Sequence, residues 1–322
     1  MTVQRIAMLQ PVGEEQLGII RSLLPDGFVV HAVAGRSQAD LEAAATEADY
    51  AVWWDLPVPE AVMAAGPRLR LLHKWGVGID NVDLEAARRR GILVARTTGS
   101  NAIPVAEFTV GALIALARRI PWAHASTANG GWEKNAVWRR SIMVSGKTVG
   151  IVGMGSIGKG VAKRLAAFDC RILYHNRSRL PAAEESALGA EYGTLDDLLR
   201  ESDVVSLHCP LTPETRGMLD ARAFGLMKPG ALLVNVARGG VVVEDALVDA
   251  LRSGHLAGAA VDVFEAEPPP PDHPLLRMDN VLVTPHIAST AYENSRRSIG
   301  HWLGNILRVS RGEPIPEADR VA

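Results

Sequence analysis

The 322-residue sequence contains only two cysteines, almost no net charge and no long apolar run. Cys170 and Cys209 fall in or beside expected core strands, where cysteines are more typically small buried side chains than redox or metal-binding groups. A formal net charge of −2 without a lysine-rich run gives no basic footprint for nucleic acid. No apolar run approaches the roughly 20 residues that span a bilayer, and the N-terminus has no signal-peptide pattern. We therefore expect a cytoplasmic protein without a metal, nucleic-acid or membrane site.

Short apolar strands alternate with helices along most of the chain, which is long enough for two domains. This alternation is typical of α/β folds, in which helices cover both faces of a parallel sheet. The expected strands are Arg5–Leu9, Phe28–Val33, Tyr50–Trp54, Leu69–Trp75, Ile92–Ala95, Lys147–Val152, Arg171–Tyr174, Val204–Cys209, Ala231–Val236, Leu256–Val263 and Val281–Thr284.

Two segments suggest how the domains are connected. Thr97–Asn101 resembles a crossing between domains, and an almost wholly apolar helix is expected from Pro104 to about Arg119. Residues 120–146 carry three tryptophans but little periodicity. They could form an arm between domains or across a subunit interface, or a packed surface loop. The expected final helix, about Tyr292 to Ser310, has an apolar stripe that needs a partner, and packing on the first domain would bury it.

A glycine pattern marks the expected cofactor site. Gly153, Gly155 and Gly158 lie between the strand Lys147–Val152 and a helix, as in the G-x-G-x-x-G fingerprint of dinucleotide-binding domains. The phosphates would sit on N–H groups at the start of that helix, including those of Ser156 and Ile157.

The residues after the next strand bear on the choice of cofactor. The fingerprint normally has an acidic residue here that binds the ribose 2′-hydroxyl, whereas this chain has Asn176, Arg177 and Arg179. A carboxylate would repel a 2′-phosphate, and arginine can bind it, so the sequence favours NADP over NAD. The alternative is that Asn176 binds a plain ribose while both arginines face solvent.

Three polar residues follow three expected strands of the same domain: Arg238, Glu267 and His286. Histidine is suited to donate and accept a proton near pH 7, and a carboxylate beside it favours the imidazolium. Arginine can bind a substrate carboxylate through two parallel hydrogen bonds. Together these residues suggest hydride transfer to a carbonyl, although each alone would more often be structural or solvated.

A second glycine loop, Gly76–Asp83, follows the strand Leu69–Trp75. Ligands of open α/β sheets bind beyond the carboxyl ends of the strands, so this loop could offer backbone N–H groups to an anion. It could equally be a plain turn in which Asp80 and Asn81 cap the next helix.

From about Leu69 to Asn294 the sequence resembles the D-isomer-specific 2-hydroxyacid dehydrogenases. The resemblance is carried by the motifs Gly76–Asp83, Gly99–Ala102 with Val105–Glu107, Val152–Gly158, His208–Gly217, Asn235–Gly240, Asp262–Pro268 and Thr284–Ala288.

This resemblance implies roles for individual residues. Arg238 would bind the substrate carboxylate, together with backbone N–H groups of Val77 and Gly78. His286 would be the acid in reduction and the base in oxidation, paired with Glu267. On the cofactor side, the implied contacts are Asp262 with the nicotinamide amide, Ala237 with the nicotinamide ribose, and Cys209, Pro210 and Thr215 with the adenosine. Asn176 departs from the aspartate of NAD-specific members.

The resemblance also implies an architecture. A Rossmann domain that binds NAD(P), residues 101–289, would be inserted into a flavodoxin-like substrate domain made of residues 1–100 and 290–322. Two chains would form a homodimer mainly through the cofactor domains, and each would close about a hinge over its substrate.

The leading functional hypothesis is reduction of a small 2-keto acid such as glyoxylate or hydroxypyruvate. Formate-oxidising relatives carry glutamine in place of Glu267, which argues against that reaction. Phosphite oxidation keeps the same three residues and stays open. A dinucleotide-sensing co-regulator on the same fold is the non-enzymatic alternative, although the chain has no long disordered tail.

We predict that Arg177→Ala raises the KM for NADPH far more than the KM for NADH, because only NADPH carries the 2′-phosphate. Initial rates with both cofactors measure the two constants. Equal effects on both would mean that Arg177 does not bind the 2′-phosphate.

Overall fold

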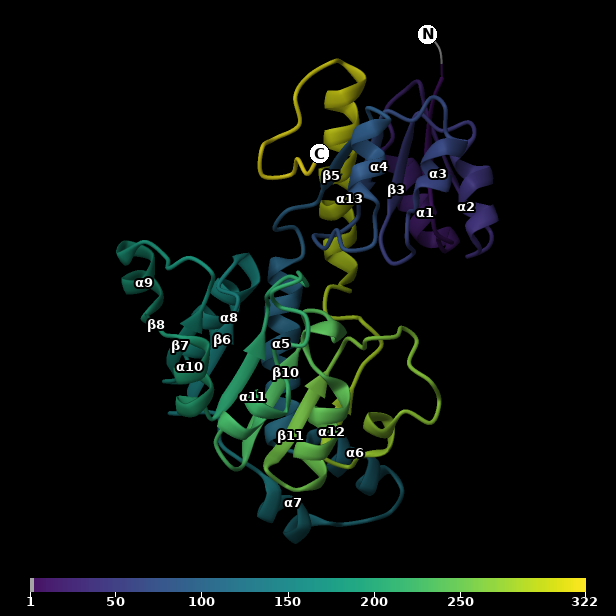
Figure 1. Cartoon of the computed structure of the whole chain (residues 1–322). Coiled ribbons are helices and arrows are strands. Elements are labelled where there is room, and N and C mark those ends of the chain that lie inside the picture. Colours follow the sequence, from purple (N-terminus) through teal and green to yellow (C-terminus); the bar gives the residue numbers. More distant parts are fainter. Residues whose placement is uncertain (1–2) are drawn as a thin grey trace. The chain divides into compact units, whose positions relative to one another are not determined.

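A computed structural model describes residues 3–322, which divide into two compact units (Figure 1). One unit comprises residues 3–101 and 290–322, and the other comprises Ala102–Ser289. Each unit has its own parallel sheet between helices, in agreement with the predicted α/β fold. Within residues 3–322, no helix combines the length and the apolar character needed to cross a membrane.

The discontinuous unit contains a five-stranded sheet of order β2-β1-β3-β4-β5, in which all pairs are parallel. Its strands are β1 (Gln4–Met8), β2 (Phe28–Ala32), β3 (Tyr50–Trp53), β4 (Leu71–Lys74) and β5 (Leu93–Arg96). Helices α2 (Gln38–Ala45), α3 (Glu60–Ala65) and α4 (Leu84–Arg89) cover one face, and α1 (Glu14–Leu23) and α13 (Tyr292–Ser310) cover the other.

The C-terminal part of the chain completes this unit, as the apolar stripe of the final helix led us to expect. Ile299 and Trp302 of α13 are fully buried in the core that also contains Ile6 and Leu71. After α13 the chain turns back along β5, where the N–H of Val321 donates to the carbonyl of Val94 (2.8 Å). This last pairing was not predicted from the sequence.

A buried polar network ties α13 to the sheet. His73 on β4 accepts at Nε2 from Nδ2 of Asn305 (3.0 Å), and its Nδ1 bonds to the Lys74 carbonyl (3.0 Å). Asn305 also donates to Asp319 (3.0 Å), which pairs with His301 (2.6 Å). Burial lowers the pKa of His73 from 6.5 to about 3, so its ring stays neutral in the folded protein.

The continuous unit contains a seven-stranded parallel sheet of order β12-β11-β10-β9-β6-β7-β8. The chain starts at the inner strand β6, winds outward to β8, and then returns to β9 on the other side of β6. The strands are β6 (Thr148–Val152), β7 (Arg171–His175), β8 (Ala190–Tyr192), β9 (Val204–Leu207), β10 (Ala231–Asn235), β11 (Leu256–Val261) and β12 (Val281–Val283).

Helices cover both faces of this sheet. One core lies under α5 (Ala102–Ala117) and α8 (Ser156–Ala166), with α9 (Ala182–Leu188) beside it. The other core lies under α10 (Leu195–Glu201), α11 (Ala221–Leu226) and α12 (Glu244–Arg252). Two short 3₁₀ turns, η1 (Gly239–Val241) and η2 (Pro274–Arg277), follow β10 and β11.

The structure corrects the expectation for residues 120–146, which contain two helices, α6 (Ile120–Ala128) and α7 (Lys134–Arg140). Neither helix has a buried residue, so no core-facing stripe imposes the apolar period by which a helix is recognised. Trp132 and Trp138 are 82% and 74% exposed. The short edge strand β8 was also missed, since two of its three residues are exposed.

We predict that His73 makes the free energy of unfolding fall with acid. Below pH 6.5 His73 is protonated in the unfolded chain, whereas in the folded protein it stays neutral down to about pH 3. Stability should therefore drop by about 1.4 kcal/mol per pH unit in this window from this residue. Urea denaturation at several pH values gives the free energy of unfolding of the wild type and of His73→Gln. This free energy should fall less steeply with decreasing pH in the variant. The exposed His124→Gln is the control, and equal slopes in all three proteins would contradict the prediction.

Candidate active site

The glycine loop between β6 and α8 is shaped by three different steric demands. Gly153 has φ +100°, and a Cβ there would lie 2.5 Å from the Cys209 nitrogen. A Cβ on Gly158 would lie 2.4 Å from the Gly153 carbonyl oxygen. A Cβ on Gly155 would meet no atom within 4 Å, so this glycine borders open space at the start of α8. Gly153 and Gly158 thus serve the tight turn, and Gly155 leaves room for a ligand.

The residues after β7 hold the same loop from the other side. Oδ1 of Asn176 accepts from the N–H of Met154 (2.6 Å), which fixes the peptide between the first two glycines. Arg179 is exposed, as one alternative expected, and it also donates twice to Glu185 (2.9 and 2.8 Å). Arg177 remains exposed, and its charge is a minor contributor to the lowered pKa of Glu214, which depends first on a hydrogen bond from Thr212.

The loop after β9 forms the adjoining wall. Oγ1 of Thr215 donates to the Pro210 carbonyl (2.7 Å) and accepts from the N–H of Thr212 (2.8 Å), which closes the loop into a compact turn. Cys209 is buried, and burial raises the pKa of its thiol to about 11. The thiol therefore stays protonated at neutral pH and acts as a small apolar side chain.

These features fit a dinucleotide. The space beside Gly155 lies at the start of α8, where no side chain caps the first N–H groups, those of Ser156 and Ile157 among them. A pyrophosphate can bind such N–H groups directly. The loop also lies where the strand order reverses, next to β6 and β9, which is where open α/β sheets bind ligands.

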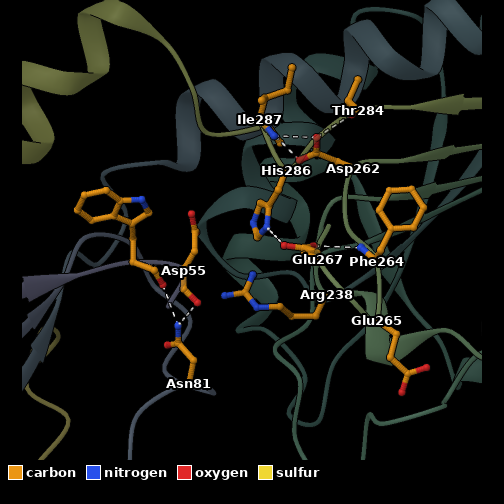
Figure 2. A network of polar contacts seen from close by, with 12 residues as sticks. Asp55, Asn81, Arg238, Asp262, Phe264, Glu265, Glu267, Thr284, His286 and Ile287 are labelled. Atoms are coloured by element: carbon orange, nitrogen blue, oxygen red, sulfur yellow. Dashed lines mark hydrogen bonds and ion pairs between the residues drawn. The ribbon is translucent and has the colours of Figure 1, made fainter. Parts of the chain in front are cut away.

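Arg238, Glu267 and His286 follow the neighbouring strands β10, β11 and β12, and the structure brings them together (Figure 2). Nδ1 of His286 lies 2.8 Å from Oε2 of Glu267, and both side chains are a little over one third exposed (38% and 36%). Oε1 of Glu267 accepts from the N–H of Phe264 (3.0 Å). Arg238 donates to the Ala237 carbonyl (2.8 Å).

The electrostatics of this group favour a protonated histidine. The hydrogen bond to Glu267 raises the pKa of His286, against the opposing effects of burial and of the Arg238 charge. Burial has the largest single effect and raises the pKa of Glu267, but the hydrogen bond and charge of His286, the Phe264 N–H and the Arg238 charge together hold that pKa below its usual value. Arg238 lowers both pKa values. A carboxylate and an imidazolium ready to donate a proton follow from this arrangement.

Asp262 has a role in this structure that the sequence analysis did not find. Its buried carboxylate accepts from Oγ1 of Thr284 (2.7 Å) and from the N–H groups of Ile287 and Ala288 (2.9 Å each). Its carbonyl accepts from the N–H of His286 (2.8 Å), whose φ of +53° is rare for a side-chain-bearing residue. Asp262 therefore holds the histidine loop in a conformation it would not adopt alone. The sequence did contain a signal for this role, because Asp262 and Thr284 each directly follow one of two adjacent strands, β11 and β12.

The loop that contains Val77 and Gly78 belongs to the other unit. It starts with Gly76 at φ +142°, and both following residues are half-buried. Neither Asp80 nor Asn81 caps α4, because Asp83 does so by accepting from the N–H of Ala86 (2.9 Å).

Asn81 instead organises the loop after β3, as Figure 2 shows in part. Its Oδ1 accepts from Nε1 of Trp53 (3.0 Å) and from Nζ of Lys74 (2.9 Å). Its Nδ2 donates to the carbonyl groups of residues 54–56 (2.9–3.1 Å). This one side chain therefore joins the loops that follow β3 and β4.

Comparison with known families gives a match over most of the continuous unit. Residues 110–288 match the family described as "D-isomer specific 2-hydroxyacid dehydrogenase, NAD binding domain".

Individual relatives cover more of the chain. A protein from Thermofilum pendens named glyoxylate reductase is 44% identical over 257 residues, which are 79% of this chain and 76% of that protein. An Archaeoglobus fulgidus protein named D-3-phosphoglycerate dehydrogenase is 37% identical over 317 residues, which are 98% of this chain but only 59% of that longer protein. The crystal structure of TT0316 from Thermus thermophilus superposes with a TM-score of 0.88 at 36% identity and covers 99% of this chain and 100% of that one.

We predict that Glu267→Gln lowers the pKa of His286 by about one pH unit, because a glutamine oxygen can accept the hydrogen bond but carries no charge to stabilise the imidazolium. Titration of ¹³C-labelled histidines by NMR measures this pKa, with the signal assigned by its loss in His286→Asn. The exposed neighbour Glu265→Gln removes the same charge and is the control. An unchanged pKa in Glu267→Gln would contradict the pairing.

Proposed function

This chain belongs to the D-isomer specific 2-hydroxyacid dehydrogenase family of oxidoreductases that act on CH–OH donors, and we propose that it reduces the C2 carbonyl of a small 2-keto acid with NADPH. The observation that carries the proposal is the hydrogen bond between His286 and Glu267 with Arg238 beside them, at the carboxyl edge of the cofactor sheet. The continuous unit is the cofactor domain, and the discontinuous unit is the substrate domain.

His286 supplies the proton in this reaction. Its Nδ1 is bonded to Glu267, so Nε2 is the atom that donates to the developing alkoxide oxygen and accepts the proton back in oxidation. The nicotinamide cofactor supplies or accepts the hydride when it is bound. One keto acid, one hydride and one proton give one 2-hydroxy acid. Glu267 remains ionised and favours the imidazolium before transfer.

Arg238 fixes the other end of the substrate. Its guanidinium binds the carboxylate of the keto acid, which orients the neighbouring carbonyl toward His286. The backbone N–H groups of Val77 and Gly78 are proposed to bind the same carboxylate. Ala237 and Asp262 would contact the nicotinamide end of the cofactor, and Cys209, Pro210 and Thr215 its adenosine end.

The proposed preference for NADP rests on Asn176 and Arg177. Asn176 fixes Met154 as a carboxylate would, yet it does not repel a 2′-phosphate. Arg177 is the exposed cation beside it, since the carboxylate of Glu185 already binds Arg179. The 2′-phosphate contact is therefore assigned to Arg177 with Asn176.

Glyoxylate and hydroxypyruvate are the proposed substrates, because relatives named glyoxylate reductase match three quarters or more of their own length at 41–44% identity. We also propose a homodimer through the cofactor domains. The exposed tryptophans Trp132 and Trp138, beside and within α7, offer two aromatic side chains for that contact.

We predict that the protein reduces glyoxylate and hydroxypyruvate, and does so faster with NADPH than with NADH. His286→Ala should lose about two to four orders of magnitude in kcat, the usual worth of a positioned acid, while NADPH binding measured by fluorescence is retained. A variant that keeps most of its kcat would remove His286 as the proton donor. Oxidation of phosphite, with no turnover of either keto acid, would favour the alternative substrate.

A further inference from the structure

The peptide that joins Phe264 to Glu265 is a junction of three segments of the cofactor unit. The Phe264 N–H donates to Glu267, as described above, and the next N–H, that of Glu265, donates to Oε1 of Glu244 (2.8 Å). The backbone of Gly239 packs against the same peptide, since a Cβ there would lie 1.9 Å from the Phe264 carbonyl carbon. Two successive N–H groups are therefore held by two different carboxylates.

Glu244 is itself fixed by a second histidine. Nε2 of His273 lies 3.0 Å from Oε2 of Glu244, and the two side chains are only 13% and 18% exposed. Nδ1 of His273 accepts from the N–H of Leu275 (3.3 Å), so the proton of the neutral ring is on Nε2 and points at Glu244. The His273 ring also meets the Phe264 ring edge-on, with centroids 5.6 Å apart. This buried arrangement lies outside the substrate-binding and proton-transferring groups.

We propose that Glu244, held by His273, is a positioning residue for the acid–base pair. Glu244 fixes the Glu265 N–H, which fixes the Phe264–Glu265 peptide, and the Phe264 N–H then keeps one oxygen of Glu267 in place. The other oxygen of Glu267 is thereby aimed at Nδ1 of His286. The inference rests on the proposed function, because it concerns the residues that we assign to proton transfer there.

The physical basis is a loss of alignment when Glu244 is absent. Without the Glu244 carboxylate, the Glu265 N–H loses a charged acceptor, and the peptide is free to shift toward another one. Glu267 follows through its bond to Phe264, so the bond to His286 lengthens and the imidazolium loses stabilisation. The other charges that face His286 are those of Arg238 and Asp262, which are held by other contacts and stay in place.

The test compares Glu244→Ala, Glu244→Gln and Asp245→Asn. Glu244→Gln removes the charge but keeps an oxygen for the Glu265 N–H, and Asp245→Asn removes a charge from the exposed neighbour on the same helix. Reduction needs protonated His286, so its pKa sets the alkaline limb of the pH profile of kcat/KM. We expect Glu244→Ala to shift this limb down by about one pH unit, and the other two variants to leave it within a few tenths of wild type.

A lower kcat in Glu244→Ala with an unmoved limb would overturn the proposal, because a merely structural contact predicts that result. A limb that moves equally in Glu244→Gln would overturn it as well, since charge alone would then be the cause. Histidine NMR reads the pKa of His286 without a substrate. If wild type turns over none of the keto acids, the proposed function fails, and the NMR titration still decides whether Glu244 positions Glu267. If Glu244→Ala folds poorly, His273→Phe takes its place. This variant keeps the aromatic contact with Phe264 but removes the hydrogen-bond donor to Glu244, and we expect the same downward shift of the alkaline limb.

Discussion

The hydrogen bond between His286 and Glu267 constrains most of the structure around it. The two side chains come from loops that follow different strands, so each loop must be held independently before the bond can form. Asp262 holds the histidine loop through three hydrogen bonds to its carboxylate. Gly239 lets a third loop approach the glutamate side without a steric clash. Several residues with no chemistry of their own are thus required by one contact.

The topology of the sheet explains how these loops meet. All seven strands are parallel, so their carboxyl ends lie along one edge, and β10, β11 and β12 are direct neighbours. The polar residues after these strands therefore meet although Arg238 and His286 are far apart in sequence. The glycine loop after β6 lies at the same edge, where the strand order reverses. The cofactor loop and the acid–base pair therefore both follow the rule that ligands of open α/β sheets bind at the carboxyl ends of the strands.

The sequence was informative where a residue's role is local. The α/β fold, most strands to within one or two residues, and the final helix Tyr292–Ser310 followed from the periodicity of apolar residues. Helices α6 and α7 were not recognised because neither has a buried residue that would impose a helical period on the sequence. Other features depend on contacts between segments that are distant in the sequence and were therefore not predicted. They are the pairing of Val321 with Val94 and the structural roles of Asn81, Asp262 and Glu244. The pairing of Arg179 with Glu185 was not predicted either, although Arg179 is exposed as one alternative expected.

The contact between Asn176 and Met154 also bears on how the protein ages. Oδ1 of Asn176 accepts the hydrogen bond that holds the glycine loop, so replacing the amide nitrogen Nδ2 by oxygen would leave the loop intact. Direct hydrolysis of the side-chain amide makes that exchange: water adds, ammonia leaves and an aspartate remains. The product would be a correctly folded molecule with a carboxylate beside Arg177, and hence with the ribose site of an NAD enzyme. An old preparation would then differ from a fresh one in its cofactor preference while its melting curve stayed the same.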